Sequence, residues 1–278
     1  MMQKTFVGAC MFRHSAQSCR LFECVLEENQ TALCAFWEIA GCCRKDVLVG
    51  INNLELHMKE LVARFKALDT TCVSDALDKL GIVGGVYGVK PLLSGKKICG
   101  TAFTVRYVPC RPVKGNVGDF LDDVKPGEVV VIDNGGRDYC TVWGDIMAVF
   151  AKKTGIEGTV IDGVCRDVPV IKEIEYPMFT KGYYMVTGKD RVEVESVNAT
   201  VSLSGVSVAP GDIILGDDSG VVVIPRPRAE DVLKIAEQIN ETENAILKAI
   251  ENNSTLKAAR EKAGYHHLQT KSVKGAEV

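Results

Sequence analysis

Three charged residues, Asp145, Arg166 and Asp167, are the side chains of this sequence whose types best suit a chemical step. Carboxylates are hard oxygen ligands that hold a divalent cation directly or through water. A guanidinium binds a carboxylate or an enolate through two parallel hydrogen bonds. Together these groups predict a site for a small oxo acid bound with Mg²⁺ or Mn²⁺.

The three charges lie in two glycine-containing segments, "DNGGRDYCTVWGD" (133–145) and "DGVCRD" (162–167). Glycines let backbone amides approach a ligand closely. The amides at the start of the helix expected near Trp143 favour an anion, such as a substrate carboxylate. We therefore expect backbone as well as side-chain groups to bind the ligand.

The elements around these segments predict that the segments meet. "PGEVVVIDNGG" indicates a turn, a buried strand and a glycine loop, and "IEGTVIDGVCRD" indicates the next strand and turn. Between them "VWGDIMAVFAKKTG" indicates a helix with Ile146, Val149 and Phe150 facing inward and Gly155 as its C-cap. A strand–helix–strand unit forms a parallel crossover, so both loops should open on one sheet edge, where α/β proteins bind ligands.

Structural interpretations of the same residues stay open at this point. Asp145 is also a suitable acid for the first turn of a helix, and Arg166 with Asp167 is also a plain surface ion pair. Asp133 and Asp162 are expected to be structural loop acids rather than catalysts. The segment "GDDSG" (216–220) suits a hairpin turn, with donation of acids to a neighbouring subunit's site as the alternative.

The rest of the chain predicts an α/β protein with a substantial antiparallel or mixed sheet. Apolar residues recur at helical spacing from Leu54 to Leu68, and a second short helix follows with Thr70 or Thr71 as its cap. Strands are expected in "KICGTAFTVRYV" and between Tyr183 and Ile224. Pro227 should open a long amphipathic helix, which a polar tail with helical potential follows.

Composition narrows the class of function. The 278-residue chain is 46% hydrophobic and 25% charged, with a net charge of −3 and no basic run, so neither nucleic acid nor membrane is an expected partner. Its four histidines accompany no nucleophile motif, and neither a P-loop nor a dinucleotide fingerprint is present. With no signal-peptide core and no paired CxxC motif, the 11 cysteines are expected to be reduced thiols of a cytoplasmic protein.

The sequence changes character near residue 54. Six of the cysteines lie in the first 43 residues, where hydrophobic periodicity is poor. We predict a poorly defined cysteine-rich extension over residues 1–54 and one domain over residues 55–278. Met58 lies near the start of the periodic region, so a translation start upstream of the true one is an alternative explanation of the extension.

From about residue 55 to the end of the long helix, the sequence resembles the RraA-like family. The resemblance runs through "VSDAL", "GTAFTV", "PGEVVVIDNGG", "WGDIMA", "GVCRD" and "DDSGVVVIP". Its most specific item is an Asp, twenty residues, then Arg-Asp, which Asp145, Arg166 and Asp167 satisfy. The family includes class II aldolases that cleave 4-hydroxy-4-methyl-2-oxoglutarate and 4-carboxy-4-hydroxy-2-oxoadipate.

The resemblance implies a role for each matching position. Asp167 would hold the metal, Arg166 would bind substrate and steady the enolate, and Asp145 would act through a water. The backbone of the Gly144–Met147 turn, which includes Ile146, would contact the substrate carboxylate. The implied activity is retro-aldol cleavage to pyruvate, with oxaloacetate decarboxylation as a second reaction.

The resemblance also implies a layered α/β/β fold of the swivelling-domain type, assembled as a trimer or hexamer with active sites between subunits. One position departs from the family pattern, which often has an acid three residues after the last Asp where this chain has Val170. Two alternatives therefore stay open. One is a related lyase or isomerase acting on another oxo acid, and the other is a non-catalytic protein-binding regulator of ribonuclease activity, a branch that lacks the second Asp of the Arg-Asp pair.

Overall fold

The computed structural model describes residues 44–111 and 118–265, with side chains from residue 53 onward. The chain divides into two compact units, Met1–Leu56 and His57–Val278. Most of the first unit lies outside the described residues, so the extension predicted over residues 1–54 stays a prediction. Among the described residues, the helices are too short or too polar to span a bilayer.

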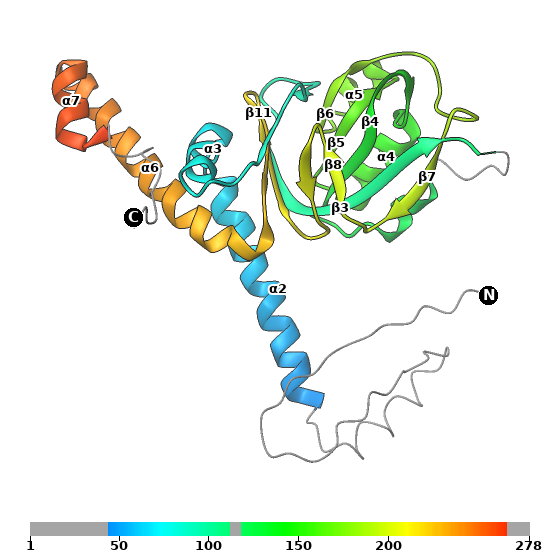
Figure 1. The fold of residues 1–278 in the computed structure, drawn as a ribbon, viewed down its shortest axis with the longest axis horizontal. Coiled ribbons are helices and arrows are strands. Elements are labelled where there is room, and N and C mark those ends of the chain that lie inside the picture. The colour runs from blue at the N-terminus through cyan, green and yellow to red at the C-terminus, as the bar shows by residue number, and fades with distance from the viewer. Residues whose placement is uncertain (1–43, 112–117, 266–278) are drawn as a thin grey trace, which may run out of the picture. The chain divides into compact units, whose positions relative to one another are not determined.

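The second unit alternates helices and strands before a run of short strands (Figure 1). The helices are α2 (Arg44–Lys66, which begins in the first unit), α3 (Thr70–Lys79), α4 (Asp145–Thr154), α5 (Val168–Glu173), α6 (Ala229–Glu251) and α7 (Leu256–Ala263). The strands are β1 (Gly85–Val86), β2 (Lys90–Pro91), β3 (Ile98–Pro109), β4 (Val129–Thr141), β5 (Gly158–Cys165), β6 (Met178–Tyr183), β7 (Val192–Val197), β8 (Val201–Leu203), β9 (Val206–Val208), β10 (Ile213–Asp217) and β11 (Gly220–Ile224).

Nine of these strands form one mixed sheet in the order β1-β11-β10-β3-β4-β5-β6-β2, with β7 paired to β3. Its centre, β3-β4-β5-β6, is parallel, and the remaining pairs are antiparallel. This confirms the predicted α/β class with a mixed sheet. It also confirms the parallel crossover from β4 through α4 to β5.

Alternating side chains of the central strands divide the core between the two faces of the sheet. Val130 and Ile132 of β4 belong to a cluster that includes residues of α4 and α5. Val129 and Val131 of the same strand belong to a cluster completed by β8 and β9, which pair as a separate hairpin. The period of two that a strand imposes on its side chains therefore produces the helix, sheet and hairpin layers.

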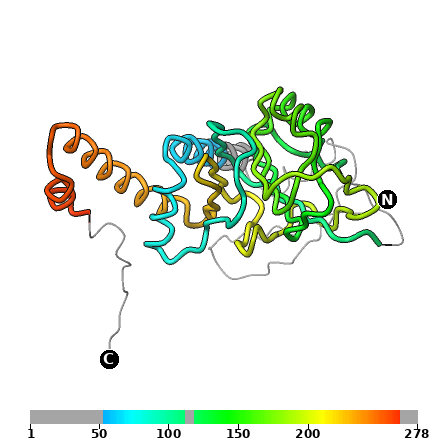
Figure 2. The backbone as a smooth tube through the Cα atoms, turned by 90° about the horizontal axis from the view of Figure 1, so that it is seen from above, coloured from blue at the N-terminus to red at the C-terminus, as the bar shows by residue number. Residues whose placement is uncertain are grey.

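A third apolar cluster packs helices against the antiparallel margin of the sheet. It joins α2, α3 and α6 to inward-facing residues of β10 and β11, such as Leu215 and Val222. The first half of α6 lies against α3, and its second half extends away from the sheet together with α7 (Figure 1, Figure 2). The long amphipathic helix predicted after Pro227 is confirmed, with Val232 and Ile239 fully buried.

Two local predictions were wrong. The N-cap of α3 is Asp69, whose carboxylate accepts a hydrogen bond from the Cys72 amide, and not Thr70 or Thr71. Thr70 is unavailable as a cap because its amide and hydroxyl donate to Asp217 at the end of β10, at 2.8 and 2.7 Å. The glycine loop expected after Asp133 is instead part of β4, which continues to Thr141 through two shifts of register against β5.

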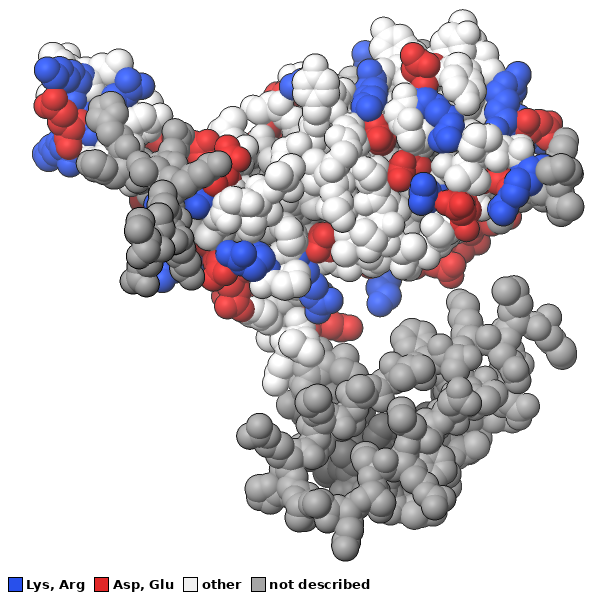
Figure 3. Space-filling model, viewed as in Figure 1, with Lys and Arg blue, Asp and Glu red and all other residues white. Residues whose placement is uncertain are grey.

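Lysines and arginines are interspersed with acids over the strand region on the face of the molecule in Figure 3. This mixture agrees with the small net charge of −3. Among the described residues in that view, no broad single-sign surface of the kind that attracts a nucleic acid is visible.

Candidate active site at the carboxyl ends of β4 and β5

The predicted site residues lie side by side at the carboxyl ends of two parallel strands. Gly144 to Met147 form the start of α4, just after β4, and Arg166 and Asp167 directly follow β5. The Arg166 amide donates to the Trp143 carbonyl at 3.0 Å, and the Asp145 amide donates to Asp167 Oδ2 at 3.2 Å. The structure therefore brings together residues that are about twenty positions apart in the chain.

Asp167 has a backbone conformation that directs its carboxylate toward α4. Its φ of 59° and ψ of 36° are left-handed, and its carbonyl accepts hydrogen bonds from the first turn of α5 at Val170 and Ile171. Few residues other than glycine adopt this conformation, although Asp tolerates it better than most. A Cβ atom placed on Gly144 would lie 2.6 Å from Asp167 Oδ2. The turn therefore depends on glycine at position 144 because the carboxylate occupies the space of a side chain.

Arg166 is held beside the same carboxylate. Its Nε lies 3.1 Å from Asp167 Oδ2, and the two side chains are 39% and 33% exposed. The terminal nitrogens, Nη1 and Nη2, have no hydrogen-bond partner in the described part of the chain. A half-exposed guanidinium with two uncommitted amino groups can bind an anion from solution.

The first turn of α4 adds a backbone anion site. Asp145 Oδ1 accepts a hydrogen bond from the Ile146 amide at 2.7 Å, and the Gly144 carbonyl accepts one from Ala148. The Met147 amide between them has no partner within the described residues. Because the helix dipole is positive at this end, this amide and the neighbouring backbone favour a carboxylate.

The predicted inward face of α4 needs correction. Ile146 is 79% exposed and Val149 is 49% exposed, whereas Ala148 and Ala151 are buried. Phe150 is partly buried against the core, as predicted, and Gly155 caps the helix with a φ of 78°. The small residues of the helix therefore face the sheet, and Ile146 remains exposed next to Asp145.

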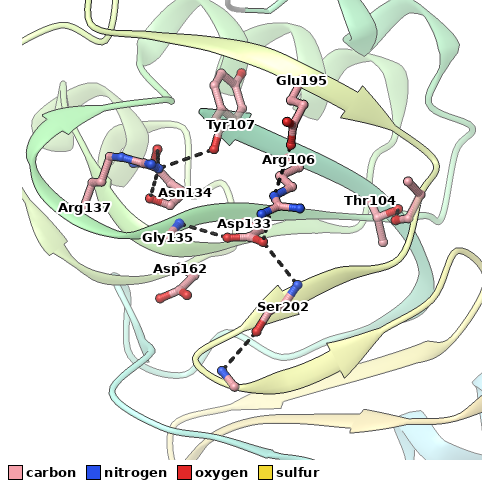
Figure 4. Close-up of polar contacts among 12 residues, drawn as sticks. Thr104, Arg106, Tyr107, Asp133, Asn134, Gly135, Arg137, Asp162, Glu195 and Ser202 are labelled. Carbon is pink, nitrogen blue, oxygen red and sulfur yellow. Dashed lines mark hydrogen bonds and ion pairs between the residues drawn. The ribbon is translucent and has the colours of Figure 1, made fainter. Parts of the chain in front are cut away.

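Asp133 and Asp162 belong to a separate polar cluster, shown in Figure 4. Asp133 accepts hydrogen bonds from the amides of Gly135 and Ser202, at 2.9 and 3.2 Å. Asp162 accepts from the amide and hydroxyl of Ser204 and forms an ion pair with Lys181 at 2.5 Å. These acids lie within strands rather than in loops, and they fasten the β8–β9 hairpin to the sheet.

Sequence reasoning missed two buried neighbours of the site. Trp143 is 2% exposed, stacks on Tyr176 with ring centroids 6.1 Å apart, and accepts the Arg166 amide through its carbonyl. Cys165 is fully buried directly before Arg166, and burial raises the pKa of its thiol to about 11. The only available signal for Trp143 was its position before Gly-Asp, which does not distinguish packing from ligand contact.

The donor set near Asp167 suits a lightly held, hydrated cation. Among the described residues, no group of three or more His, Cys, Asp and Glu side chains is arranged around a common metal position. Mg²⁺ commonly binds through one or two carboxylates and keeps several waters. The half-exposed Asp167 carboxylate, with Asp145 beside it, fits that kind of site and does not fit a structural zinc centre.

A cavity of about 420 Å³ lies elsewhere in the second unit, between the start of α3 and the strands β1 and β11. Asp145, Arg166 and Asp167 are not among the residues that line it. The candidate site faces solvent in a single chain, because the Arg166 and Asp167 side chains are partly exposed. We assign the chemistry to that surface because its charged groups converge there, and enclosure alone does not identify a site.

Comparison with known proteins relates this arrangement to one family. Residues 70–223 match the family model described as "RraA-like: Aldolase/RraA". A protein of Halalkalibacterium halodurans named "Putative 4-hydroxy-4-methyl-2-oxoglutarate aldolase" is 34% identical over 70% of this chain and 90% of its own length. Protein DlpA of Legionella pneumophila is 43% identical over 73% of this chain, but the match spans only 34% of that longer protein.

Two solved structures share the fold. One, from Pseudomonas syringae pv. tomato, is 40% identical with a TM-score of 0.69 and covers 73% of this chain and 97% of its own. The other, from Streptomyces coelicolor, is described as an unusual member of the RNase ES inhibitor RraA protein family. It is 28% identical with a TM-score of 0.63, and it covers 66% of this chain and 94% of its own.

Proposed function

This chain belongs to the Aldolase/RraA family, and we propose that it is a divalent-metal-dependent carbon–carbon lyase. The proposed reaction is retro-aldol cleavage of 4-hydroxy-4-methyl-2-oxoglutarate-type 2-oxo acids to pyruvate, with oxaloacetate decarboxylation as a second activity. The observation that carries the proposal is the convergence of Arg166 and Asp167 on the first turn of α4. Relatives named as aldolases of this substrate support the choice of reaction.

Arg166 is the proposed anion-binding group. Its uncommitted Nη1 and Nη2 are suited to the C1 carboxylate and C2 oxygen of a 2-oxo acid. Cleavage moves negative charge onto that oxygen as pyruvate enolate forms. A guanidinium already held in place by Asp167 stabilises the developing charge without having to reorganise.

Asp145 is the proposed base. Retro-aldol cleavage requires removal of the C4 hydroxyl proton while the C3–C4 bond breaks, and a water next to the Asp145 carboxylate can receive that proton. The same water can return a proton to C3 of the enolate. Oxaloacetate has no C4 hydroxyl proton to remove, so its decarboxylation needs the enolate-stabilising groups and not the base.

Asp167 is the proposed metal ligand, with Asp145 acting through a bound water. When bound, a divalent cation such as Mg²⁺ or Mn²⁺ would supply Lewis acidity toward the substrate's oxygens. The Asp167 carboxylate would hold it while its Oδ2 keeps the Asp145 amide and Arg166 in position. The Met147 amide and the start of α4 would bind a substrate carboxylate.

We also propose that the active protein is a cytoplasmic homotrimer or hexamer with its sites between subunits. The half-exposed side chains at the site and the 79% exposed Ile146 beside them leave one side of the substrate uncovered in a single chain. A second copy could cover that side and exclude water, which strengthens electrostatic interactions at the site.

The decisive experiment measures pyruvate release from 4-hydroxy-4-methyl-2-oxoglutarate and from oxaloacetate, with Mg²⁺ or with EDTA. The Asp167→Ala variant is compared with Asp162→Ala, whose carboxylate belongs to the other cluster. We expect release from both substrates that is lost with EDTA and in Asp167→Ala, and retained per folded molecule in Asp162→Ala.

Two other results would redirect the assignment. Decarboxylation without aldol cleavage would keep the enolate-stabilising site and favour a lyase or isomerase for another oxo acid, in line with Val170 in place of an acid. Absence of both activities in a folded oligomer supplied with metal would overturn the proposal. The non-catalytic regulator, suggested by the likeness to the Streptomyces coelicolor protein, would then be the better assignment.

A further inference from the structure

The irregular part of β4 sets the register of the candidate site. β4 and β5 pair in step from Val129 and Gly158 up to Asp133 and Asp162. Beyond that point β4 advances eight residues, from Asp133 to Thr141, while β5 advances only two, from Asp162 to Val164. An ordinary β-bulge adds one residue to one strand, so this is a much larger irregularity, divided into two shifts at Arg137 and Thr141.

The site lies directly beyond the second shift, in the restored register. Thr141 pairs with Val164, and two residues further along each strand the Arg166 amide donates to the Trp143 carbonyl. The next residues are Gly144 and Asp145, which contact Asp167. A slip of one residue would reverse the faces of all side chains beyond it, so the two shifts decide which groups of β4 meet Arg166 and Asp167.

Arg137 holds the first shift through one nitrogen. Its Nη1 donates to the Asn134 carbonyl at 2.7 Å and to the Tyr107 carbonyl of β3 at 3.3 Å (Figure 4). Gly135 has a φ of 59°, and a Cβ atom there would lie 3.1 Å from Arg137 Nη1. The guanidinium therefore packs over the looped residues and ties them to the neighbouring strand.

On the neighbouring strand β5, Gly163 leaves space for the looped residues of β4. A Cβ atom on Gly163 would lie 3.0 Å from the Arg137 carbonyl and 3.0 Å from Asn134 Nδ2. Asn134 is fully buried, and its Nδ2 has no hydrogen-bond partner among the described residues. A buried amide without a partner destabilises the fold, and its persistence here indicates that surrounding contacts fix the conformation.

We propose that Arg137 is a positioning residue for the candidate active site. It does not touch the substrate, and it acts by holding the shifted register of β4, which places Gly144 and Asp145 against Asp167. This inference rests on the proposed function for its effect on turnover. Its effect on the register can be measured without turnover.

The test compares Arg137→Met and Arg137→Lys with the wild type. A matched control is Arg64→Met, which removes an arginine with two hydrogen bonds to Glu237 on the α2–α6 side of the second unit. We measure hydrogen exchange of the Asp145 and Arg166 amides, with the Val131 and Ile132 amides as an internal reference. kcat and KM for pyruvate release are measured in parallel.

We expect Arg137→Met to raise exchange at Asp145 and Arg166 about tenfold while the reference amides stay protected. kcat should fall about 100-fold, because small displacements of reacting groups have effects of that size. Arg137→Lys should restore most of both properties, since an ammonium can donate to the same two carbonyls. Arg64→Met should change neither.

The inference would be overturned if Arg137→Met had the same amide exchange rates and the same kcat as the wild type. If Arg137→Met does not fold, Gly163→Ala disturbs the same contact from β5 and should give the same selective exchange. Uniform loss of protection along β4 and β5 in Gly163→Ala would show a structural role alone and would also overturn the inference. If Arg137→Met shows the selective exchange but the wild type releases no pyruvate, the proposed function is rejected and the positioning role stands.

Discussion

Two pairs of aspartates lie on, or just after, the same two strands and differ in almost every other respect. Asp133 and Asp162 are partners in the regular part of the β4–β5 ladder and are 7% and 5% exposed. Asp145 and Asp167 come just after the irregular part and are half-exposed. The first pair is bound by backbone amides, a serine, a lysine and an arginine. The second pair retains oxygen atoms without a protein donor among the described residues.

The comparison shows what separates a structural carboxylate from a candidate catalytic one. A carboxylate has about four acceptor positions, and in the first pair both carboxylates accept from the β8–β9 hairpin and from groups of the sheet. In the second pair, among the described residues, only Asp145 Oδ1 and Asp167 Oδ2 accept hydrogen bonds or form ion pairs. Residue type is the same in both pairs, so the uncommitted acceptors and the adjacent Arg166 mark the second pair as able to bind a ligand.

The largest expected effect is a loss of activity when an acid of the second pair, but not of the first pair, is replaced. Asp167→Asn keeps the shape of the side chain but removes the charge that holds Arg166 and the proposed metal. Pyruvate release should fall by about 1,000-fold, the upper range for loss of one electrostatic group at a reacting centre. Asp162→Asn, assayed per folded molecule, should stay within about threefold of the wild type. Equal losses in the two variants would contradict the distinction drawn above.

A second variant tests the geometry of the site without changing any charge. Gly144→Ala places a methyl group where Asp167 Oδ2 now lies, because the separation would be 2.6 Å. The carboxylate must move, and kcat should fall about 100-fold. Gly85→Ala is a suitable control, since Gly85, like Gly144, does not have positive φ, and a Cβ there meets no atom within 4 Å. Unchanged kinetics in Gly144→Ala would show that the Asp167 position is not critical.

Loss of an acid from the structural pair, Asp133 and Asp162, should lower the stability of the fold instead of the activity. Asp162→Ala leaves the Ser204 amide and Lys181 without their acceptor. We expect the free energy of unfolding to fall by about 2 kcal/mol, the cost of unsatisfied polar groups at a mostly buried position. Chemical denaturation with urea measures this change. A smaller loss for Asp162→Ala than for Asp145→Ala would reverse the assignment of the two pairs.

The smallest effect concerns Asp217, a structural acid at the end of β10. Burial raises its pKa, but hydrogen bonds from Thr70 and from the amides of Ser219 and Gly220 outweigh this, so its pKa lies below the usual 3.8. A lowered pKa in the folded state stabilises the protein above the unfolded-state value and ceases to do so as pH falls through the folded value. Wild type should therefore be more stable than Asp217→Asn at pH 7, and the difference should shrink below about pH 4. A difference independent of pH would indicate that the charge of Asp217 has no part in it.

Much of the fold followed from patterns in the sequence. Apolar runs between turn residues predicted the parallel strands around α4, and helical spacing predicted α2, α3 and α6. The rotation of α4 was not predictable, because Ile146 and Val149 match an inward face by periodicity. Only the burial of Ala148 and Ala151 in the folded protein shows that the alanines face the sheet.

The prediction of structural acids at Asp133 and Asp162 relied on their positions after apolar runs. Their partners, Ser202 and Ser204, come from a hairpin some forty or more residues further along the chain, and no local pattern connects the two regions. Arg137 was missed for the same reason, since it follows two glycines and has no periodic signal. The registers that give these residues their roles are non-local.

By itself, the sequence determined the α/β class, the crossover between the two loops and the identity of Asp145, Arg166 and Asp167 as candidate site residues. It could do so because helix and strand periods and glycine turns are local properties of the chain. Only the tertiary structure decided which carboxylates are saturated by hydrogen bonds and which remain able to bind a ligand. That difference depends on the paired register of β4 and β5 and on the hairpin across them, and both depend on contacts between distant segments.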